Sequence, residues 1–336
     1  MGYKPLFLLG AGFNADVLTE FRRSRDSSLN GMLAGYPMVP ALRRLCFGET
    51  EVPPTQSIED LFQQAAEAGD LQPMKQLVRE LQKADYYLAD PLSHTTDSLN
   101  NRYAQFFEDF CDASYLTFNY DSLVEIFLMK LGRSDPRCGY GVRVRVAVLP
   151  NAGPRPIPAL PSLVLHLHGT FCVETVLCSH PQMRPNSFAW IEPLDEPEYY
   201  FQPGSTGPCF TPFEREKVGG SLYATEWVVA PIPNKATRLS EPFINAMYRQ
   251  AVTFAREQSP LVVIGYSFNA HDRASFDPIL KAVGEGAARV VVVSPDATST
   301  VGNLQEMYPA IDFRPIPTGF AEWVSRDYPG LDARPE

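Results

Sequence analysis

The sequence predicts an α/β protein built on a mainly parallel sheet. Short, almost purely aliphatic runs recur along the chain, as in strands that are buried on both faces of a sheet. Segments with apolar residues at helical spacing separate these runs. Most of the runs end in glycine or a polar residue, as strands do where they meet a turn. Together these features predict a Rossmann-like, doubly wound sheet with a helical insertion module.

We expect one domain over residues 1–336, with its first strand at residues 4–9. Apolar residues at helical spacing after Ser57, around 74–88 and at 103–110 predict a helical insertion over about residues 40–112. Further strands are expected at 114–118, 142–146, 163–168, 227–231, 261–264 and 289–293, with helices after 123, 240 and 272. Residues 172–224, rich in proline, glycine and aromatic residues, are expected to form an irregular insertion.

The composition limits which classes of protein the chain can belong to. A hydrophobic fraction of 45% and a charged fraction of 20% are typical of a folded globular chain. The net charge of -10 argues against direct binding of nucleic acid. The chain has neither a signal-like leader nor an apolar run long enough for a bilayer, so we expect a cytoplasmic protein without membrane contact. Six cysteines without a CxxC pair predict neither a disulfide framework nor a zinc site.

Polar clusters follow five of the expected strands. In a parallel sheet these positions share the carboxyl edge, where ligands bind at a switch in strand order. We therefore expect one crevice lined by several strand ends. The clusters are Gly10 to Asp16, Asn119 to Asp121, His168 with Gly169, Gly265 to Ser267, and Ser294.

Each cluster also has a purely structural interpretation. Gly10 and Gly12 permit a tight turn and the approach of a pyrophosphate, but they could equally serve packing. An ordinary dehydrogenase is disfavoured, because the third glycine and the ribose-binding acid are missing. Asn119 and Asp121 could cap the next helix. His168 could be a hydrogen-bonded core residue or, with His166, half of a metal site that lacks a third ligand.

In order and spacing, the motifs together resemble the sirtuin family, and especially its bacterial sirtuin-like branch. The resemblance spans nearly the whole chain. It implies that the glycine turn holds the NAD pyrophosphate and that His168 is the catalytic base. It implies further that Asn119 and Asp121 contact the nicotinamide ribose, whereas Gly265, Ser267 and Ser294 line the adenosine side. The matching segments are 10–14 (Gly10, Ala11, Gly12, Phe13 and Asn14), 57–61, 117–121, 167–169, 263–268 and Ser294.

The departures from the family narrow the expected activity. Phe118 stands where deacylase sirtuins have a glutamine, and the four-cysteine zinc module is missing, which disfavours deacylation. The resemblance to the bacterial branch instead implies an NAD⁺ glycohydrolase of phage defence, with catalytic residues Asn119, His168 and Asp121 and NAD⁺ as its substrate. The alternatives are an NAD or ADP-ribose sensor without turnover, a protein deacylase and an ADP-ribosyltransferase. A phosphoryl-transfer enzyme is disfavoured, because no Gly-Lys-Ser/Thr sequence occurs.

Control of such an enzyme is expected to lie outside its active site. An NADase that depletes its host's cofactor needs restraint, so we expect activation by homo-oligomerisation or by a partner such as a translocase-type ATPase. The insertion at 172–224 follows the catalytic histidine directly, and we expect it to cover the crevice as a flap.

Overall fold

The computed structural model describes residues 4–23, 43, 46–48, 58–70, 72–73, 76–77, 96–134, 140, 145–146, 162–178, 193–201, 224–228, 242–286 and 289–331. Its main feature is a six-stranded sheet in the order β10-β9-β8-β1-β2-β4, in which every neighbouring pair is parallel. This confirms the predicted fold class. The strands are β1 (Leu6–Leu9), β2 (Ser114–Thr117), β4 (Val164–His166), β8 (Leu261–Ile264), β9 (Arg289–Val293) and β10 (Asp312–Ile316).

The edge strand β10 was not predicted from the sequence. It contains Asp312, Arg314 and Pro315, so it lacks the aliphatic run that marks the buried strands. Charge and proline are typical of edge strands, where one side of the backbone needs no partner and pairing with another chain is discouraged. The aliphatic signal therefore identified β4, the strand at the other border of the sheet, but not β10.

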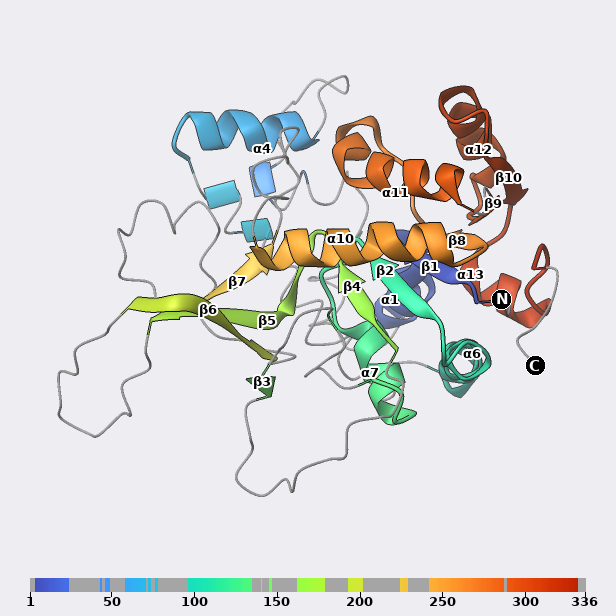
Figure 1. Cartoon of the computed structure of the whole chain (residues 1–336), viewed down its shortest axis with the longest axis horizontal. Coiled ribbons are helices and arrows are strands. Elements are labelled where there is room, and N and C mark those ends of the chain that lie inside the picture. Colours follow the sequence, from blue (N-terminus) through green and yellow to red (C-terminus); the bar gives the residue numbers. More distant parts are fainter. Residues whose placement is uncertain are drawn as a thin grey trace.

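Helices cover both faces of the main sheet (Figure 1). Side chains alternate along a strand, so Leu6 and Leu8 enter one apolar core, whereas Phe7 and Leu9 enter the other. The first core is closed by α10 (Pro242–Glu257), α11 (Arg273–Glu285) and α12 (Ala297–Met307). The second is closed by α1 (Ala15–Arg23), α6 (Asp97–Asp109), α7 (Leu123–Lys130) and α13 (Phe320–Ser325).

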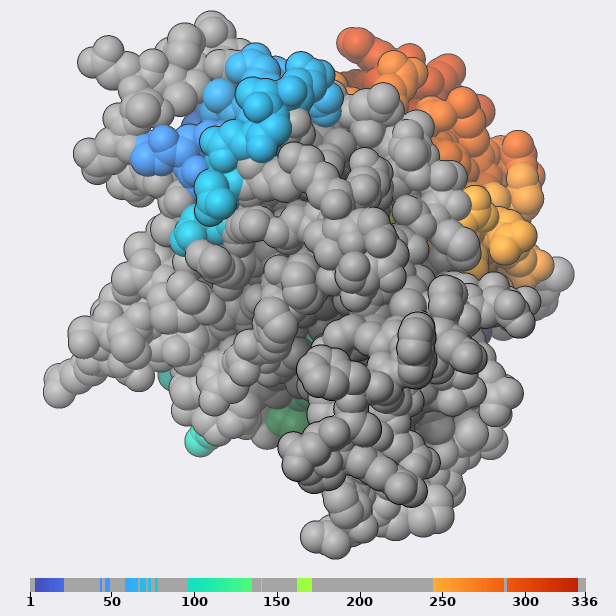
Figure 2. Space-filling model, turned by 90° about the vertical axis from the view of Figure 1, so that its left-hand side faces the viewer, coloured from blue at the N-terminus to red at the C-terminus, as the bar shows by residue number. Residues whose placement is uncertain are grey.

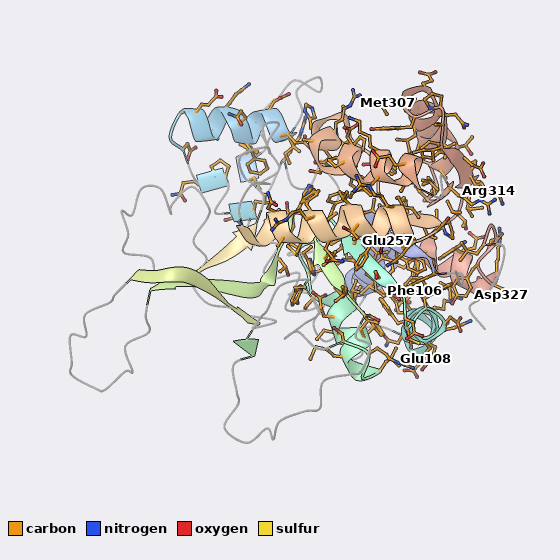
Figure 3. All side chains as sticks on the ribbon, viewed as in Figure 1. Phe106, Glu108, Glu257, Met307, Arg314 and Asp327 are labelled. Carbon is orange, nitrogen blue, oxygen red and sulfur yellow. The ribbon has the colours of Figure 1, made fainter. Side chains whose placement is uncertain are left out.

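The second core is largely aromatic. Phe106 of α6 is fully buried and packs edge-on against Phe7 of β1, with ring centroids 5.0 Å apart. Two residues along α6, Glu108 is exposed to solvent (Figure 3). This alternation at helical spacing is what the sequence pattern predicts for an amphipathic helix. It places α6, the last helix of the expected insertion, directly on the main sheet.

The helix α4 (Ile58–Glu67) is the other long described helix of the expected insertion. Figure 2 shows the molecule from the side on which α4 lies. In this view α4 and the C-terminal helices lie on the upper part of the surface. One hydrogen bond ties it to the β8–α11 connection: Asn269 Nδ2 donates to Glu59 Oε1 at 3.2 Å. Ser57, the expected capping residue, lies outside the described residues.

A second sheet is formed by residues between β2 and β8 of the main sheet and extends away from it (Figure 1). Its order is β3-β6-β5-β7, with β3 (Arg145–Val146), β5 (Gly169–Cys178), β6 (Pro193–Phe201) and β7 (Ala224–Val228). The prediction of an irregular segment at 172–224 is therefore wrong where β5, β6 and the first residue of β7 lie. Prolines and glycines dominate the local sequence, while the strands are stabilised by pairing with distant partners. The remaining residues of that segment lie outside the described part of the chain.

None of the described helices is both long and apolar enough to cross a membrane.

Candidate functional site

The site lies where the direction of strand addition reverses. From β1 the chain adds β2 and then β4 on one side, and later β8, β9 and β10 on the other. All six strands are parallel, so their carboxyl ends share one edge, and the reversal between β1 and β8 is the point at which such sheets bind ligands in a crevice. The short helix η1 (Ala11–Asn14) follows β1, Asn119 follows β2, His168 follows β4 and Gly265 follows β8.

Three glycines form the floor of this crevice by direct backbone contact. A Cβ on Gly10 would lie 2.6 Å from the Gly265 carbonyl oxygen, and one on Gly12 would lie 2.7 Å from the Gly265 Cα. Gly265 itself has a φ of +63°, and a Cβ there would lie 2.4 Å from the Gly12 carbonyl carbon. Packing thus explains why these positions need glycine.

The same contact uses two amides of the turn. Gly10 N–H donates to the Ile264 carbonyl and Gly12 N–H to the Gly265 carbonyl, both at 2.9 Å. A phosphate at this turn would therefore have to bind other backbone amides nearby. One of these is the amide of Ala11, an exposed residue at the start of η1. Sequence reasoning weighed packing and phosphate binding as alternatives. The packing role is seen directly.

Asn14 and Asp121 form a buried pair between η1 and the β2–α7 loop. Asn14 Nδ2 donates to Asp121 Oδ2 at 2.6 Å, and the Leu123 N–H donates to Asp121 Oδ1 at 3.1 Å. Asp121 therefore holds the start of α7, as a capping residue would. Among the described residues, no hydrogen-bond partner satisfies the buried Asn14 Oδ1. A buried acceptor of this kind suits a ligand that brings a hydroxyl donor.

Asn119 is oriented by its own side chain. Its Nδ2 donates to the Gly10 carbonyl at 3.0 Å, which joins the β2 loop to the glycine turn. Its backbone N–H donates to Thr117 Oγ1 at 3.0 Å. With one Nδ2 hydrogen donated to Gly10, the second N–H of the amide and its acceptor, Oδ1, remain for other contacts.

His168 is held by a residue that sequence reasoning missed. Its Nε2 lies 2.8 Å from Ser275 Oγ, and both residues are buried, with exposures of 5% and 0%. The signal was present, because Ser275 is a polar residue on the otherwise apolar inner face of α11. The ring of Phe118 lies 4.5 Å from that of His168 and also 4.5 Å from that of Tyr266, so Phe118 connects β4 to the β8 turn.

Asp272 gives this side of the site a negative potential. Burial, followed by the charge of Asp272, raises the pKa of Tyr266 well above its ordinary value. Burial is also the main cause of the raised pKa of Tyr120 and of Tyr248, to which Asp272 adds. The three hydroxyls stay protonated at neutral pH. The buried Tyr266 hydroxyl lacks a hydrogen bond of normal geometry within the described chain.

The two histidines of the β4 region contact different partners. His166 Nε2 lies 2.5 Å from Glu125 Oε1, and its Nδ1 lies 2.9 Å from the Asn119 carbonyl oxygen. His168 instead contacts Ser275 and Phe118. The described residues contain no group of three or more histidine, cysteine or acidic side chains placed to hold a metal ion. The described residues therefore offer no third ligand for a metal site built on His166 and His168.

Six of the predicted site residues contact one another, His168 packs against Phe118 beside Asn119, and Ser267 and Ser294 lie apart. Hydrogen bonds or backbone contacts link Gly10, Gly12, Asn14, Asn119, Asp121 and Gly265. Ser267 is exposed just beyond this group. Ser294 Oγ accepts from the Asp296 N–H at 3.2 Å, a contact within its own turn at the end of β9.

Comparison with known proteins gave matches to solved structures alone. No family model matches the chain, and no curated protein matches it. A Sir2 homologue in complex with NAD is similar, with a TM-score of 0.46 and 15% identity over 97% of this chain and 88% of that chain. A mutant Sir2 homologue in complex with ADP-ribose has a TM-score of 0.43 and 14% identity over 97% and 90%. Both of these similar structures are thus Sir2 homologues.

Proposed function

We propose that the protein is an NAD⁺ glycohydrolase that releases nicotinamide and ADP-ribose, linear or cyclised. The observation that carries the proposal is the placement of Asn119 and His168 at the ends of the neighbouring strands β2 and β4, on one side of the switch point, with the Asn119 amide fixed on Gly10. The ordered sirtuin-like motifs motivate the choice of NAD⁺. The unpartnered, buried Asn14 Oδ1 is consistent with a hydroxyl-bearing ligand.

The chemistry requires orientation and a base. Water adds to the ribose carbon as its bond to nicotinamide breaks, and the electron pair of that bond neutralises the ring nitrogen. The leaving group therefore needs no proton. Asn119 Oδ1 can accept a hydrogen from the attacking water, and His168 can take the proton that the water loses. Asp121, whose two oxygens accept from Asn14 and Leu123, can stabilise the developing positive charge electrostatically rather than act as a nucleophile.

Ser275 decides which nitrogen of His168 can act. Its Oγ faces Nε2, so for His168 to be a base the serine must accept the Nε2 hydrogen. The lone pair then lies on Nδ1. If the serine donated instead, Nδ1 would carry the hydrogen and the basic nitrogen would be blocked. The proposal therefore assigns the Nε2–H tautomer to the free enzyme.

The proposal extends to the setting of the enzyme. We propose a cytoplasmic effector of bacterial phage defence without structural zinc, activated by self-assembly or by a partner such as a translocase-type ATPase. It does not bind nucleic acid directly or associate with a membrane. Support comes from the motif resemblance, the net charge of -10 and the scattered cysteines. A sensor that binds NAD⁺ or ADP-ribose without turnover is the competing function.

The test is His168→Ala compared with the wild type and with Gln305→Ala, a control on the exposed face of α12. His168→Ala should lower NAD⁺ turnover by about 10² to 10⁴-fold. Dinucleotide affinity should change little, because a base acts in the transition state. Chromatography of products and calorimetric binding measure the two effects. Binding without turnover in the wild type, under every activating condition tried, would favour the sensor.

A further inference from the structure

His166, the last residue of β4, faces an oxygen acceptor at each ring nitrogen. The Asn119 carbonyl lies 2.9 Å from Nδ1 and Glu125 Oε1 lies 2.5 Å from Nε2. Both His166 and Glu125 are almost completely buried, at 0% and 1% exposure. A carbonyl oxygen can only accept, so Nδ1 must carry a hydrogen. The pair is charged if the hydrogen between Nε2 and Glu125 Oε1 is bound to the nitrogen, and neutral if it is bound to the oxygen.

The surroundings favour the charged pair. Burial disfavours an imidazolium, but the Glu125 carboxylate outweighs that cost, and the pKa of His166 is raised above its ordinary value. The Tyr140 hydroxyl donates to Glu125 Oε1 at 2.9 Å, which stabilises the carboxylate further. Asp121 adds a second negative charge near His166. Because both ring nitrogens face acceptor oxygens, an imidazolium that donates at each of them fits this arrangement.

One of those two bonds reaches a residue of the proposed active site. The Asn119 carbonyl accepts from His166, its N–H donates to Thr117, and its side chain donates to Gly10. Of these contacts, the bond from His166 ties Asn119 to β4. That strand leads to His168 two residues later. The bond therefore fixes the separation of Asn119 and His168, which a reaction between them requires.

We propose that His166, paired with Glu125, is a positioning residue that sets the backbone of Asn119 and so aims its side-chain amide at the reacting centre. The inference rests on the proposed function for its effect on catalysis. The hydrogen-bonding arrangement itself can be measured without any turnover.

Two substitutions separate the two bonds of His166. In His166→Asn the amide nitrogen replaces Nδ1 and can still donate to the Asn119 carbonyl, whereas the bond to Glu125 is lost. In His166→Gln the longer amide reaches Glu125 and leaves the carbonyl unsatisfied. Each variant keeps one of two buried partners, so both should lose stability. Gln258→Leu, which breaks the buried bond to Ser114 at the amino-terminal end of β2, is a destabilising control far from the site.

The expected result is that His166→Asn and Gln258→Leu keep most of the wild-type kcat for NAD⁺. His166→Gln should lose up to about 10²-fold in kcat, with little change in KM, because misplacing a positioned group costs rate more than binding. Equal kcat values in the two His166 variants, measured where both are folded, would overturn the inference.

Nuclear magnetic resonance of the full chain gives a second readout that needs no catalysis. At pH 7 both His166 ring nitrogens should be protonated, and the Asn119 side-chain amide should be hydrogen-bonded in the wild type and in His166→Asn but not in His166→Gln. That pattern in a chain that leaves NAD⁺ intact would support the positioning role while the proposed function fails. A neutral His166 ring, or an undisturbed Asn119 amide in His166→Gln, would overturn it.

Discussion

At the scale of single residues, the site depends on how polar groups are satisfied at a buried sheet edge. A buried donor or acceptor without a partner costs about 1–3 kcal/mol, so side chains near the crevice are paired wherever the chain allows. Asn119 is tied to Gly10, and Asp121 to Asn14. Asn14 Oδ1 is one exception, since it is buried without a hydrogen-bond partner in the described chain. A bound ligand with a hydroxyl group would gain a hydrogen bond there.

Ser275→Ala tests the tautomer of His168. Without the serine oxygen, the neutral ring is free to take either tautomer, so a smaller fraction of molecules has its basic nitrogen in the productive place. We expect kcat for NAD⁺ to fall by less than the ~10² to 10⁴-fold expected for loss of the base, while KM stays near its wild-type value. Steady-state kinetics measures both constants. Ser299→Ala, on the exposed side of α12, is the matched control. A kcat equal to that of the wild type would remove Ser275 from the site.

At the scale of secondary-structure elements, the crevice depends on the close approach of two turns. The β1–η1 turn and the β8 turn touch through backbone atoms. Two backbone hydrogen bonds of 2.9 Å join them, from the Gly10 N–H to the Ile264 carbonyl and from the Gly12 N–H to the Gly265 carbonyl. The pair of turns therefore forms a rigid floor between the two halves of the sheet. The loops that carry Asn119 and His168 follow β2 and β4, which both lie on the β1 side of this floor.

Gly265→Ala should be strongly destabilising. The residue has a positive φ, and the new methyl group would lie 2.4 Å from the Gly12 backbone, so the turns must separate. We expect a loss of more than about 2 kcal/mol in the free energy of unfolding, measured by urea titration. Gly302→Ala in α12, where a Cβ meets no atom within 4 Å, should instead be neutral or stabilising by about 0.5–1 kcal/mol. Equal effects of the two changes would refute this description of the floor.

The bond between β4 and α7 predicts how stability depends on pH. The folded-state pKa of His166 is raised, so its contribution is fully present below the ordinary histidine value of about 6.5 and is lost as the pH rises through the folded pKa. Glu125, Asp121 and Tyr140 are the other titratable groups around it. The difference in unfolding free energy between the wild type and Glu125→Gln should therefore shrink from pH 6 to pH 9. A constant difference would contradict the ion pair.

How much the sequence predicted follows from the range of the forces involved. Five strands of the main sheet were predicted because burial on both faces demands aliphatic runs, and the ends of four of them located Gly10, Asn119, His168 and Gly265. Ser275 stands out locally as a polar residue on the apolar face of α11, but it was not predicted as a site residue, because its contact with His168 spans 107 positions. The strands β5 and β6 were missed for a similar reason. Their stability comes from pairing with each other, whereas the local composition favours turns.

At the scale of the whole molecule, the doubly wound sheet brings residues from the entire chain to one edge. Asn14, Asn119, His168 and Gly265 come from four separate strand ends, and α11 supplies Ser275 behind them. A net charge of -10 would repel an anionic dinucleotide at long range, so recognition must depend on short-range contacts in the crevice. Control of access by an activating partner or by self-assembly remains a proposal at this scale.

The most direct measurement is incubation of the purified full chain with NAD⁺, alone and with candidate partners, followed by chromatography of the products. The wild type is expected to convert NAD⁺ to equal amounts of nicotinamide and ADP-ribose, linear or cyclised, and His168→Ala to leave it intact under the same conditions. Nicotinamide release at the same rate from the wild type and His168→Ala would contradict the assignment of the base. Intact NAD⁺ with the wild type, alone and with every partner, would contradict the glycohydrolase itself.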